Sequence, residues 1–167
     1  MRKTLPNLLI AGVMLLTLSS CPGEPWEPLY TSFQPVMMKR ADMEAAVQLE
    51  GPRDIVTPAK IYTREPYLLI SERYKGIHII DNRNPVQPQP LGFIRIPGCV
   101  DMAVKGNIIY ADNAVDLIAL DMSDLSDIKV VKRVKNAFPV LLPPDLGELP
   151  QAYQNLEEDM IIIEWRQ

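Results

Sequence analysis

The chain has 167 residues and a net charge of −4. Nucleic-acid binding calls for a basic surface, so this balance argues against nucleic acid as a partner. Two cysteines do not make a disulfide framework, and the length is sufficient for one domain with a hydrophobic core.

The first twenty residues have the pattern of an export signal. Two basic residues precede an uncharged apolar run, Leu8 to Leu18, which is shorter than the roughly 20 residues of a membrane-spanning helix. The run ends in "LSSC", Leu18 to Cys21, which resembles the lipobox of bacterial lipoproteins. The resemblance implies cleavage between Ser20 and Cys21 and attachment of lipid to Cys21. An ordinary cleaved secretory signal with a chance cysteine at its end is the alternative.

A lipid on Cys21 would make the membrane the first partner of the mature protein. Each buried acyl methylene contributes about 0.8 kcal/mol, so two or more chains anchor a protein stably. Pro22 stands where, in the enterobacterial sorting rule, an aspartate would retain a lipoprotein in the inner membrane. The sequence therefore predicts a cell-envelope protein, as an outer-membrane lipoprotein.

Residues 21–42 are predicted to be a proline-rich tether. Four prolines between Pro22 and Pro35 disfavour regular structure and favour an extended chain. A spacer of this kind is expected between a lipid anchor and a folded domain. The folded domain is accordingly predicted to span residues 43–167.

From about residue 59 onward, short β-branched and aromatic runs alternate with turn residues. The runs are five to seven residues long and are separated by breaks such as "REP", "YKG" and "NRNP". Short runs between turn signals predict strands and not helices. The predicted class is all-β, with short antiparallel meanders.

These runs repeat with a period of forty residues. The stretch "YLLISERYKGIHIID" (67–81) aligns with "NIIYADNAVDLIALD" (107–121), and residues 57–65 upstream align with 97–105 without a gap. Such a period in an all-strand segment is typical of propeller-type repeats with four strands each. We therefore expect a partial β-propeller with two four-stranded antiparallel blades.

The blades are expected at about 57–96 and 97–136, followed by a C-terminal loop and strand at 137–167. Two blades cannot close a ring, since propellers typically have at least four. We expect lysines on the last repeat strand to protect one open sheet edge. The final apolar run "MIIIEW" (160–165) is predicted to fold back as a strand and to cover another edge.

Asp81 and Asp121 end equivalent strands of the two repeats, forty residues apart. Each precedes a turn, where an aspartate can accept hydrogen bonds from backbone N–H groups. We interpret them as one structural position that occurs twice. A catalytic carboxylate pair or a calcium site is the alternative, but equivalent positions in neighbouring blades have no reason to converge at 5–10 Å or so.

The segments "GIHIIDNRNP" and "VDLIALDMSD" also resemble the LVIVD repeat of bacterial surface and periplasmic β-propellers. The longer stretch around them resembles the N-terminal repeats of Bacteroidetes LVIVD-repeat lipoproteins, over about residues 56–139. The resemblance implies a propeller-type scaffold on a lipidated, exported protein, in a group whose members mostly have no assigned activity. This chain departs from the group because it has only two complete repeats.

Residues that carry catalysis or bind metals are few. The single histidine, His78, is expected to be a structural residue of a strand, and Cys99 a small buried residue, with a reactive thiol as the alternative. One histidine and one free cysteine make a poor start for a transition-metal site. We therefore expect no catalytic residue, metal or cofactor.

Taken together, these features predict a non-enzymatic binding or assembly module of the cell envelope. Its protein partner would be another envelope protein or a second copy, bound through the open sheet edges. A glycan-binding or adhesin protein is the first alternative, and a propeller-type hydrolase is the second.

Overall fold

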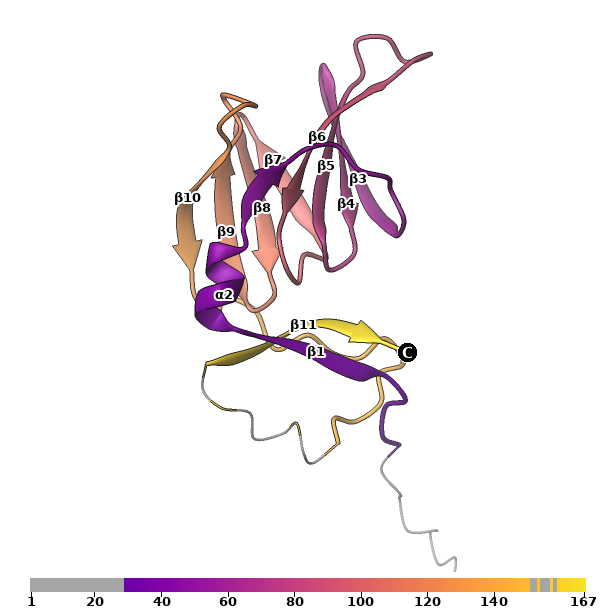
Figure 1. Cartoon of the computed structure of the whole chain (residues 1–167), viewed down its shortest axis with the longest axis vertical. Helices are drawn as coiled ribbons and strands as arrows, with labels where there is room; N and C mark the ends of the chain where they lie inside the picture. The colour runs from indigo at the N-terminus through magenta and orange to yellow at the C-terminus, as the bar shows by residue number, and fades with distance from the viewer. Residues whose placement is uncertain (1–28, 151–152, 154–156, 158) are drawn as a thin grey trace, which may run out of the picture.

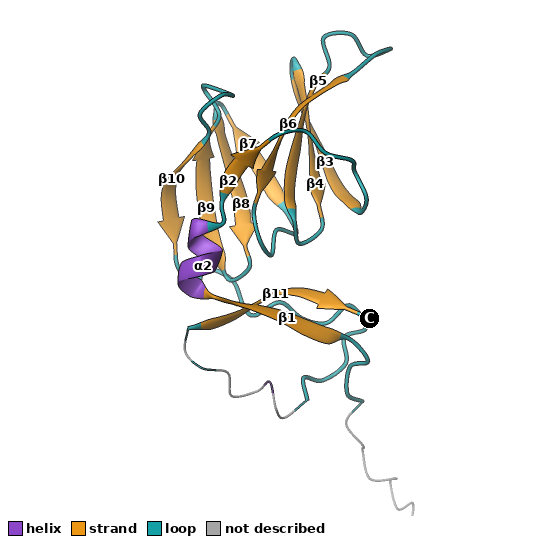
Figure 2. Ribbon diagram, in the orientation of Figure 1, coloured by secondary structure: helices purple, strands orange, loops and turns teal. Residues whose placement is uncertain are grey.

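The computed structural model describes residues 29–150, 153, 157 and 159–167. These residues form three antiparallel sheets and one short helix (Figure 1 and Figure 2). No sheet in this part of the chain closes on itself. Within the same residues, no helix is long and apolar enough to cross a membrane. The predicted all-β class is therefore confirmed.

The first sheet has five strands in the order β2-β6-β5-β4-β3. Its meander, which we call the first repeat sheet, consists of β3 (Pro58–Arg64), β4 (Tyr67–Glu72), β5 (Gly76–Asp81) and β6 (Gln89–Arg95). The preceding strand β2 (Gln48–Glu50) pairs antiparallel with β6 and covers that edge. The β6 edge of this sheet, which we expected to be open, is thus covered by a strand from the N-terminal side of the chain.

The second sheet is another four-stranded meander, which we call the second repeat sheet. It consists of β7 (Met102–Lys105), β8 (Ile108–Asn113), β9 (Asp116–Asp121) and β10 (Lys129–Val134). The strands β5 and β9 correspond at an offset of 40 residues, and the pairing of β6 on β5 and of β10 on β9 shifts register at the same point. The forty-residue repeat is therefore structural.

The gap-free alignment of the repeats is wrong by one residue in its first half. Tyr67 opens β4 and pairs with Asp81, whereas its counterpart opposite Asp121 is Ile108, 41 residues further on. The loop between β4 and β5 spans residues 73–75, but only residues 114 and 115 lie between β8 and β9. This one-residue deletion changes the offset from 41 in β3 and β4 to 40 in β5 and β6.

Both of these turns contain a residue with positive φ. Tyr74 and Ala114 have φ values of 64° and 56°, in the left-handed region that few residues other than glycine adopt. In the first turn Gly76 has φ 144°, and a Cβ there would lie 1.9 Å from the carbonyl oxygen of Ile94. Only glycine therefore lets β5 approach β6 this closely.

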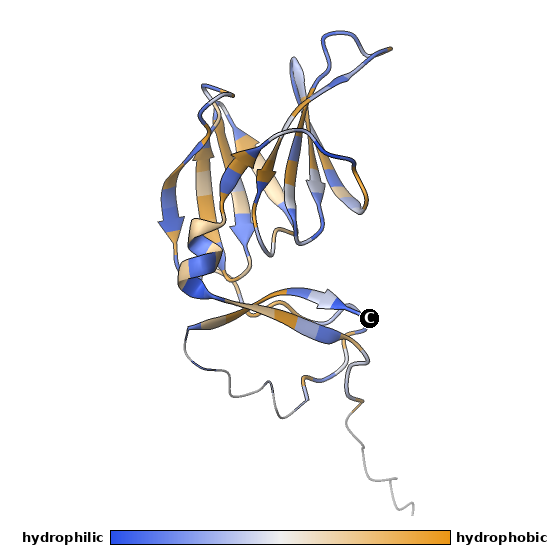
Figure 3. Ribbon diagram, viewed as in Figure 1, coloured by the Kyte–Doolittle hydropathy of each residue, from blue (hydrophilic) through white to orange (hydrophobic). Residues whose placement is uncertain are grey.

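The two repeat sheets pack face to face over a shared apolar core (Figure 3). Side chains alternate between the two faces of a strand, so each sheet contributes one face, which we call its inner face. The core residues are at most 2% exposed: Leu69, Ile77, Ile79 and Ile94 from the first sheet, and Met102, Ile109, Ala111, Ile118 and Leu120 from the second. Burial of each larger side chain contributes about 1.5–3 kcal/mol before entropy.

The predicted C-terminal strand is present as β11 (Met160–Arg166) and lies within the domain. It pairs antiparallel with β1 (Gln34–Lys39) in a two-stranded sheet beneath the repeat sheets (Figure 1). The expectation that it covers an edge of a repeat sheet is wrong, because the apolar run of β1 is its partner. Within the described residues, β10 keeps an open edge that carries Lys129 and Lys132.

The predicted tether, residues 21–42, extends too far. Its described part contains β1 and the start of the helix α2 (Arg40–Ala45). Pro35 is compatible with β1 because each strand of a two-stranded sheet has one unpaired side, where a missing N–H removes no ladder bond. The folded part of the chain therefore begins well before residue 43.

Residues 29–32 also belong to the fold, since they bind a segment near the C-terminus. The backbone N–H of Thr31 donates to the carbonyl of Glu148 at 3.0 Å, and the N–H of Glu148 donates to the carbonyl of Leu29 at 2.8 Å. The Thr31 hydroxyl donates to the Asp145 carboxylate at 2.8 Å. The two ends of the described chain are thus joined twice, here and in the β1–β11 sheet.

A second, smaller core connects the β1–β11 sheet to the second repeat sheet. Met43 of α2 is fully buried and packs with Ala114 and Val115 of the β8–β9 turn and with Ile161 and Ile163 of β11. The β8–β9 turn therefore rests directly on the C-terminal strand.

Candidate functional site

The predicted lipid attachment residue Cys21, and Ser20 at the predicted cleavage position, lie outside the described residues.

Asp81 and Asp121 lie at the ends of β5 and β9, each at the start of a turn. Asp81 accepts the backbone N–H of Arg83 at 2.9 Å, and Asp121 accepts that of Ser123 at 2.8 Å. Hydrogen bonds from the Arg83 side chain lower the pKa of Asp81, and bonds from Ser123 lower that of Asp121. Each carboxylate acts on its own turn, and no contact among the described residues joins them.

His78 belongs to a buried charged cluster that sequence reasoning missed. Its Nε2 lies 2.8 Å from Oε2 of Glu72, and the guanidinium of Arg53 donates to the same oxygen at 2.9 Å. The centroid of the His78 ring lies 4.7 Å from that of the Phe93 ring, to which it is tilted by 58°, and the Arg53 guanidinium lies 4.0 Å from the Phe93 centroid. His78 and Glu72 are 3% and 2% exposed. One signal for the cluster was present in the sequence: His78 lies in the apolar run of β5, and a buried histidine needs a polar partner.

The chemistry available to this cluster is limited by its pairing. Burial opposes ionisation of Glu72, but hydrogen bonds from His78 and Arg53 outweigh it and lower the pKa of the carboxyl. One carboxylate oxygen is shared by two donors, and no described contact brings a hydroxyl or thiol to the imidazole. The arrangement holds the loop of residues 51–57 against the sheet.

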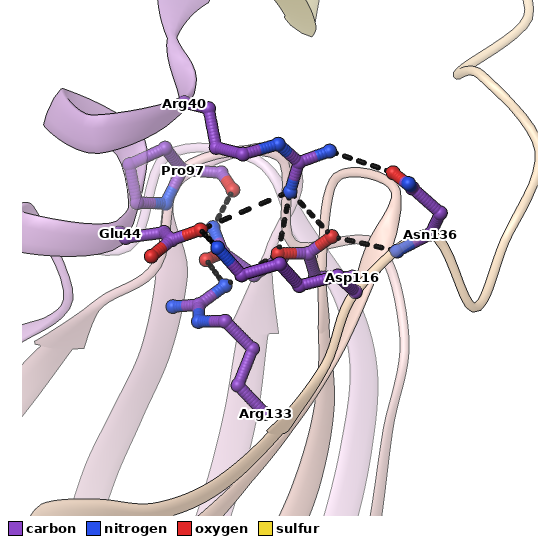
Figure 4. A network of polar contacts seen from close by, with 8 residues as sticks. Arg40, Glu44, Pro97, Asp116, Arg133 and Asn136 are labelled. Atoms are coloured by element: carbon purple, nitrogen blue, oxygen red, sulfur yellow. Dashed lines mark hydrogen bonds and ion pairs between the residues drawn. The ribbon is translucent and has the colours of Figure 1, made fainter. Parts of the chain in front are cut away.

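A second buried carboxylate, Asp116, joins α2 to the second repeat sheet (Figure 4). Arg40 donates to both of its oxygens, at 2.9 and 3.0 Å, and Arg133 donates to one at 2.9 Å. The backbone N–H of Asn136 donates to the other at 3.0 Å. Burial opposes ionisation, but these bonds outweigh it and lower the pKa of Asp116.

The network around Asp116 continues to the linker between the two repeat sheets. Asn113 accepts a hydrogen bond from Arg133 at 2.7 Å and donates one to the carbonyl of Pro97 at 2.6 Å. Asp116 and Asn113 thus each bind more than one partner within the fold. The network therefore fixes the position of α2, and it was not predicted because Arg40 and Asp116 lie 76 residues apart.

Cys99 is fully buried in the core between the sheets. Burial, together with the nearby carboxylate of Asp112, raises the pKa of its thiol well above the usual range. A thiol of this kind is a poor nucleophile. The described residues also contain no cluster of three or more histidine, cysteine, aspartate or glutamate side chains that could hold a metal ion.

The described residues line an apolar groove and a polar cavity that are open to solvent. The apolar groove, about 530 Å³, lies on the face of the second repeat sheet that points away from the first sheet, and is bordered by residues 138–142. The polar cavity, about 450 Å³, lies between the first repeat sheet and the β1–β11 sheet. Its charged lining consists of Arg53, Lys75, Arg95, Arg166, Glu50 and Glu164.

Exposed apolar side chains gather on the outer faces, the faces of the two repeat sheets that point away from the shared core. On the second sheet, Tyr110 is 38% and Val134 is 44% exposed, and Phe138 and Val140 lie beside the apolar groove. On the first sheet, Ile61 is 64% exposed. Exposed apolar residues that gather in patches mark interaction sites in soluble proteins, and here they gather most clearly around the apolar groove of the second sheet.

A scan against protein-family models found no match, and searches of curated proteins and of solved structures found none either. The candidate functional site is therefore defined by the chain's own geometry: the two outer faces, with the polar cavity as a separate candidate.

Proposed function

We propose that the chain is a non-enzymatic binding or assembly module of the bacterial cell envelope, exported and anchored by lipid at Cys21. The observation that carries the proposal is the pair of outer faces, which expose apolar residues where the inner faces bury theirs. A sheet face that is apolar and uncovered is suited to a protein partner.

The fold supports a more specific version of this proposal, in which the two repeat sheets are consecutive blades of an open, LVIVD-type propeller. Each is a four-stranded antiparallel meander, and the two share strand order, register shifts and turn geometry. By strand register, the inner face of the first sheet corresponds to the outer face of the second sheet. Two non-equivalent faces therefore meet in the shared core, as they do between successive blades of a ring.

The anchor is tested by changing Cys21 to Ser. We expect the variant to lose a metabolically incorporated palmitate analogue, because the lipobox-like motif supplies no other thiol. The matched control is Cys99→Ser, which removes a thiol from the buried core and keeps the label. Equal labelling of the Cys21 variant and the unaltered chain would contradict the proposed anchor and, with it, the proposed outer-membrane location.

The binding role is tested on membranes that contain the lipidated chain. After detergent solubilisation, affinity capture is expected to recover the chain in a defined complex, and changing Tyr110 and Val134 on the outer face to serine should release the partner. A chain that elutes as a monomer in detergent with no partner would overturn the assembly role. Turnover of esters, lactones or glycosides by the purified chain would favour the hydrolase alternative.

A second candidate function, glycan binding or adhesion, is favoured by the polar cavity. Lys75 and Arg166 both bind Glu164 there, at 2.6 and 2.9 Å, so donors and acceptors converge in a recess that Tyr74 borders. Such groups can hydrogen-bond the hydroxyls of a sugar. A glycan array probed with the unaltered chain and with Tyr74→Ala would test this role, and equal signals from the two would contradict it.

A further inference from the structure

The outer face of the second repeat sheet repeats, position by position, the inner face of the first. Tyr110 corresponds to Leu69 and Val134 corresponds to Ile94, because each pair has the same strand partners. Leu69 and Ile94 are 0% and 1% exposed, whereas Tyr110 and Val134 are 38% and 44% exposed. The second sheet therefore presents a packing surface whose counterpart is buried elsewhere in the same chain.

The outer face of the first repeat sheet likewise repeats the inner face of the second. Ile61 corresponds to Met102, since they pair with the equivalent residues Ile70 and Ala111. Met102 is 2% exposed in the shared core, but Ile61 is 64% exposed. The loop of residues 51–57 covers another part of this face, where His78 and Phe93 are 3% and 0% exposed beneath Arg53. The apolar surface that stays exposed is therefore Ile61 together with Ile55 and Val56 of the loop, at 42% and 73%.

The chain leaves the second sheet along the route by which it left the first. The N–H of Gly98 donates to the carbonyl of Tyr74 at 3.0 Å at the start of the linker to the second sheet. After β10, the N–H of Phe138 donates to the carbonyl of Val115 in the equivalent turn at 2.9 Å. Residues 138–142 thus border the apolar groove where a following sheet would begin, before two prolines redirect the chain.

One polar contact between the sheets becomes a pair of opposite charges when it is transferred to the outer faces. Arg64 of the first sheet donates to the carbonyl of Gly106 in the β7–β8 turn at 2.8 Å. The equivalent residues on the outer faces are Lys105 and Glu65, which are both exposed and carry opposite charges.

An ion pair between the two sheets can be transferred to the outer faces in the same way. Lys60 and Asp101 lie 2.6 Å apart across the two sheets and are themselves equivalent positions, one residue before Ile61 and Met102. On the outer faces, Asp101 of one copy would therefore meet Lys60 of another. Both transferred pairs unite an acid with a base.

From these correspondences we propose that two copies of this chain bind each other through different faces. The outer face of the first repeat sheet of one copy packs on the outer face of the second repeat sheet of the other copy. The contact is head-to-tail and generates a ring or an open chain. This inference rests on the proposed assembly role and specifies its partner. The continuity of the two outer faces with the interface already present in the chain favours a second copy over an unrelated protein.

The test uses cross-linking between one added cysteine on each of two chains, at positions taken from a contact inside the chain. The Tyr62 hydroxyl donates to the carbonyl of Val104 at 3.1 Å. The equivalent residues on the outer faces are Ala103 and Thr63, which are exposed. Full-length Ala103→Cys and Thr63→Cys chains with different affinity tags are purified in detergent, mixed, and treated with a short bismaleimide.

Cross-linked dimers that contain both tags, above the background of the unaltered chain, are the expected result. Neither variant alone should cross-link above that background. Efficient cross-linking within one variant would reveal a symmetric contact of like faces and would overturn the proposal. No cross-linking in the mixture would overturn it as well, and recovery of a different protein from membranes would then leave the broader assembly role intact.

Charge reversal provides the second measurement and does not endanger folding, because the residues are exposed. Lys105→Glu should lower the yield of mixed dimers about ten-fold, since it places two acids together, and Glu65→Lys on the other chain should restore it. The control is Lys39→Glu on β1, which is exposed and away from both outer faces. An equal loss in that control, or no rescue, would contradict the docking geometry.

Discussion

The first repeat sheet buries a carboxylate at the end of β4, whereas the second buries one at the start of β9. Glu72 corresponds to Asn113 in the second sheet, and Asp116 corresponds to Gly76 in the first. Each carboxylate is neutralised by an arginine from the N-terminal part of the chain, Arg53 of the β2–β3 loop for Glu72 and Arg40 of α2 for Asp116. The two repeats therefore share their strands, but they place a buried charge at different positions, each where an N-terminal arginine reaches the sheet.

The two carboxylates also differ in how completely they are enclosed. The side chains of Arg40 and Arg133 around Asp116 are 19% and 12% exposed, but that of Arg53 beside Glu72 is 39% exposed. Charge pairs gain strength as solvent is excluded. We therefore expect the second sheet to depend more strongly on its surroundings than the first.

The largest effect is expected from deleting Met160 to Gln167. The deletion removes four side chains of β11 that are at most 8% exposed, and it should lower the free energy of unfolding by about 5 kcal/mol. Amide hydrogen exchange should rise more in β8 and β9 than in β4 and β5, because the small core with Met43 lies under the second sheet.

Deletion of Gln167 alone is the matched control for this truncation and should leave the melting temperature unchanged. A protein without residues 160–167 that keeps the original melting temperature would show that the two repeat sheets do not depend on β11.

Asp116→Asn is expected to cost about 3 kcal/mol, because two arginines then lack their anionic partner in a mostly buried site. Asp121→Asn, in an exposed turn of the same sheet, serves as control and should cost much less. Urea denaturation measures both. Similar losses in the two variants would mean that the network around Asp116 adds little to the second sheet.

Acid should destabilise the chain through the same carboxylates. The pKa values of Asp116 and Glu72 are lowered from ordinary values of 3.8 and 4.5, so their stabilisation is complete above those values and is lost as the pH falls through the folded-state pKa. Burial raises the pKa of Asp112, which has the opposite effect. Unfolding measured against pH should show a shallower acid limb in Asp116→Asn than in the unaltered chain.

The smallest effects are expected from Asp81→Ala and Asp121→Ala. Each removes a carboxylate that accepts the N–H two residues later, and each should lower the melting temperature slightly, as the loss of a capping bond does. Equal shifts in thermal melting would support equivalence of the two turns. Full stability in both, with partner binding lost in only one, would instead identify a functional carboxylate.

Local patterns in the sequence were sufficient to predict the strands from β3 onward, but not β1 and β2. Apolar runs between turn residues gave β3 to β10, and the isolated run at residues 160–165 gave β11. The one-residue deletion between the repeats escaped detection because Leu68, Leu69 and Ile70 are all apolar, so a shift by one residue leaves the alignment equally good. Register became visible only through strand pairing.

The long-range contacts could not be predicted from the sequence, for a different reason. Proline content suggested that residues 34–42 are extended and unpaired, but the strand partner that orders β1 lies more than a hundred residues away in β11. The pairing of Arg40 with Asp116 and of Arg53 with Glu72 likewise depends on how the chain returns to each sheet. No local pattern encodes that return.

The joining of the two chain ends has a mechanical consequence. A force applied to the N-terminal side first reaches Thr31, which is hydrogen-bonded to Asp145 and Glu148, and is then transmitted along β1. Hydrogen bonds of an antiparallel pair lie across the strand direction, so tension along β1 loads its bonds to β11 together, in shear, instead of opening them singly. We therefore expect the β1–β11 sheet to take up force before it reaches the repeat sheets.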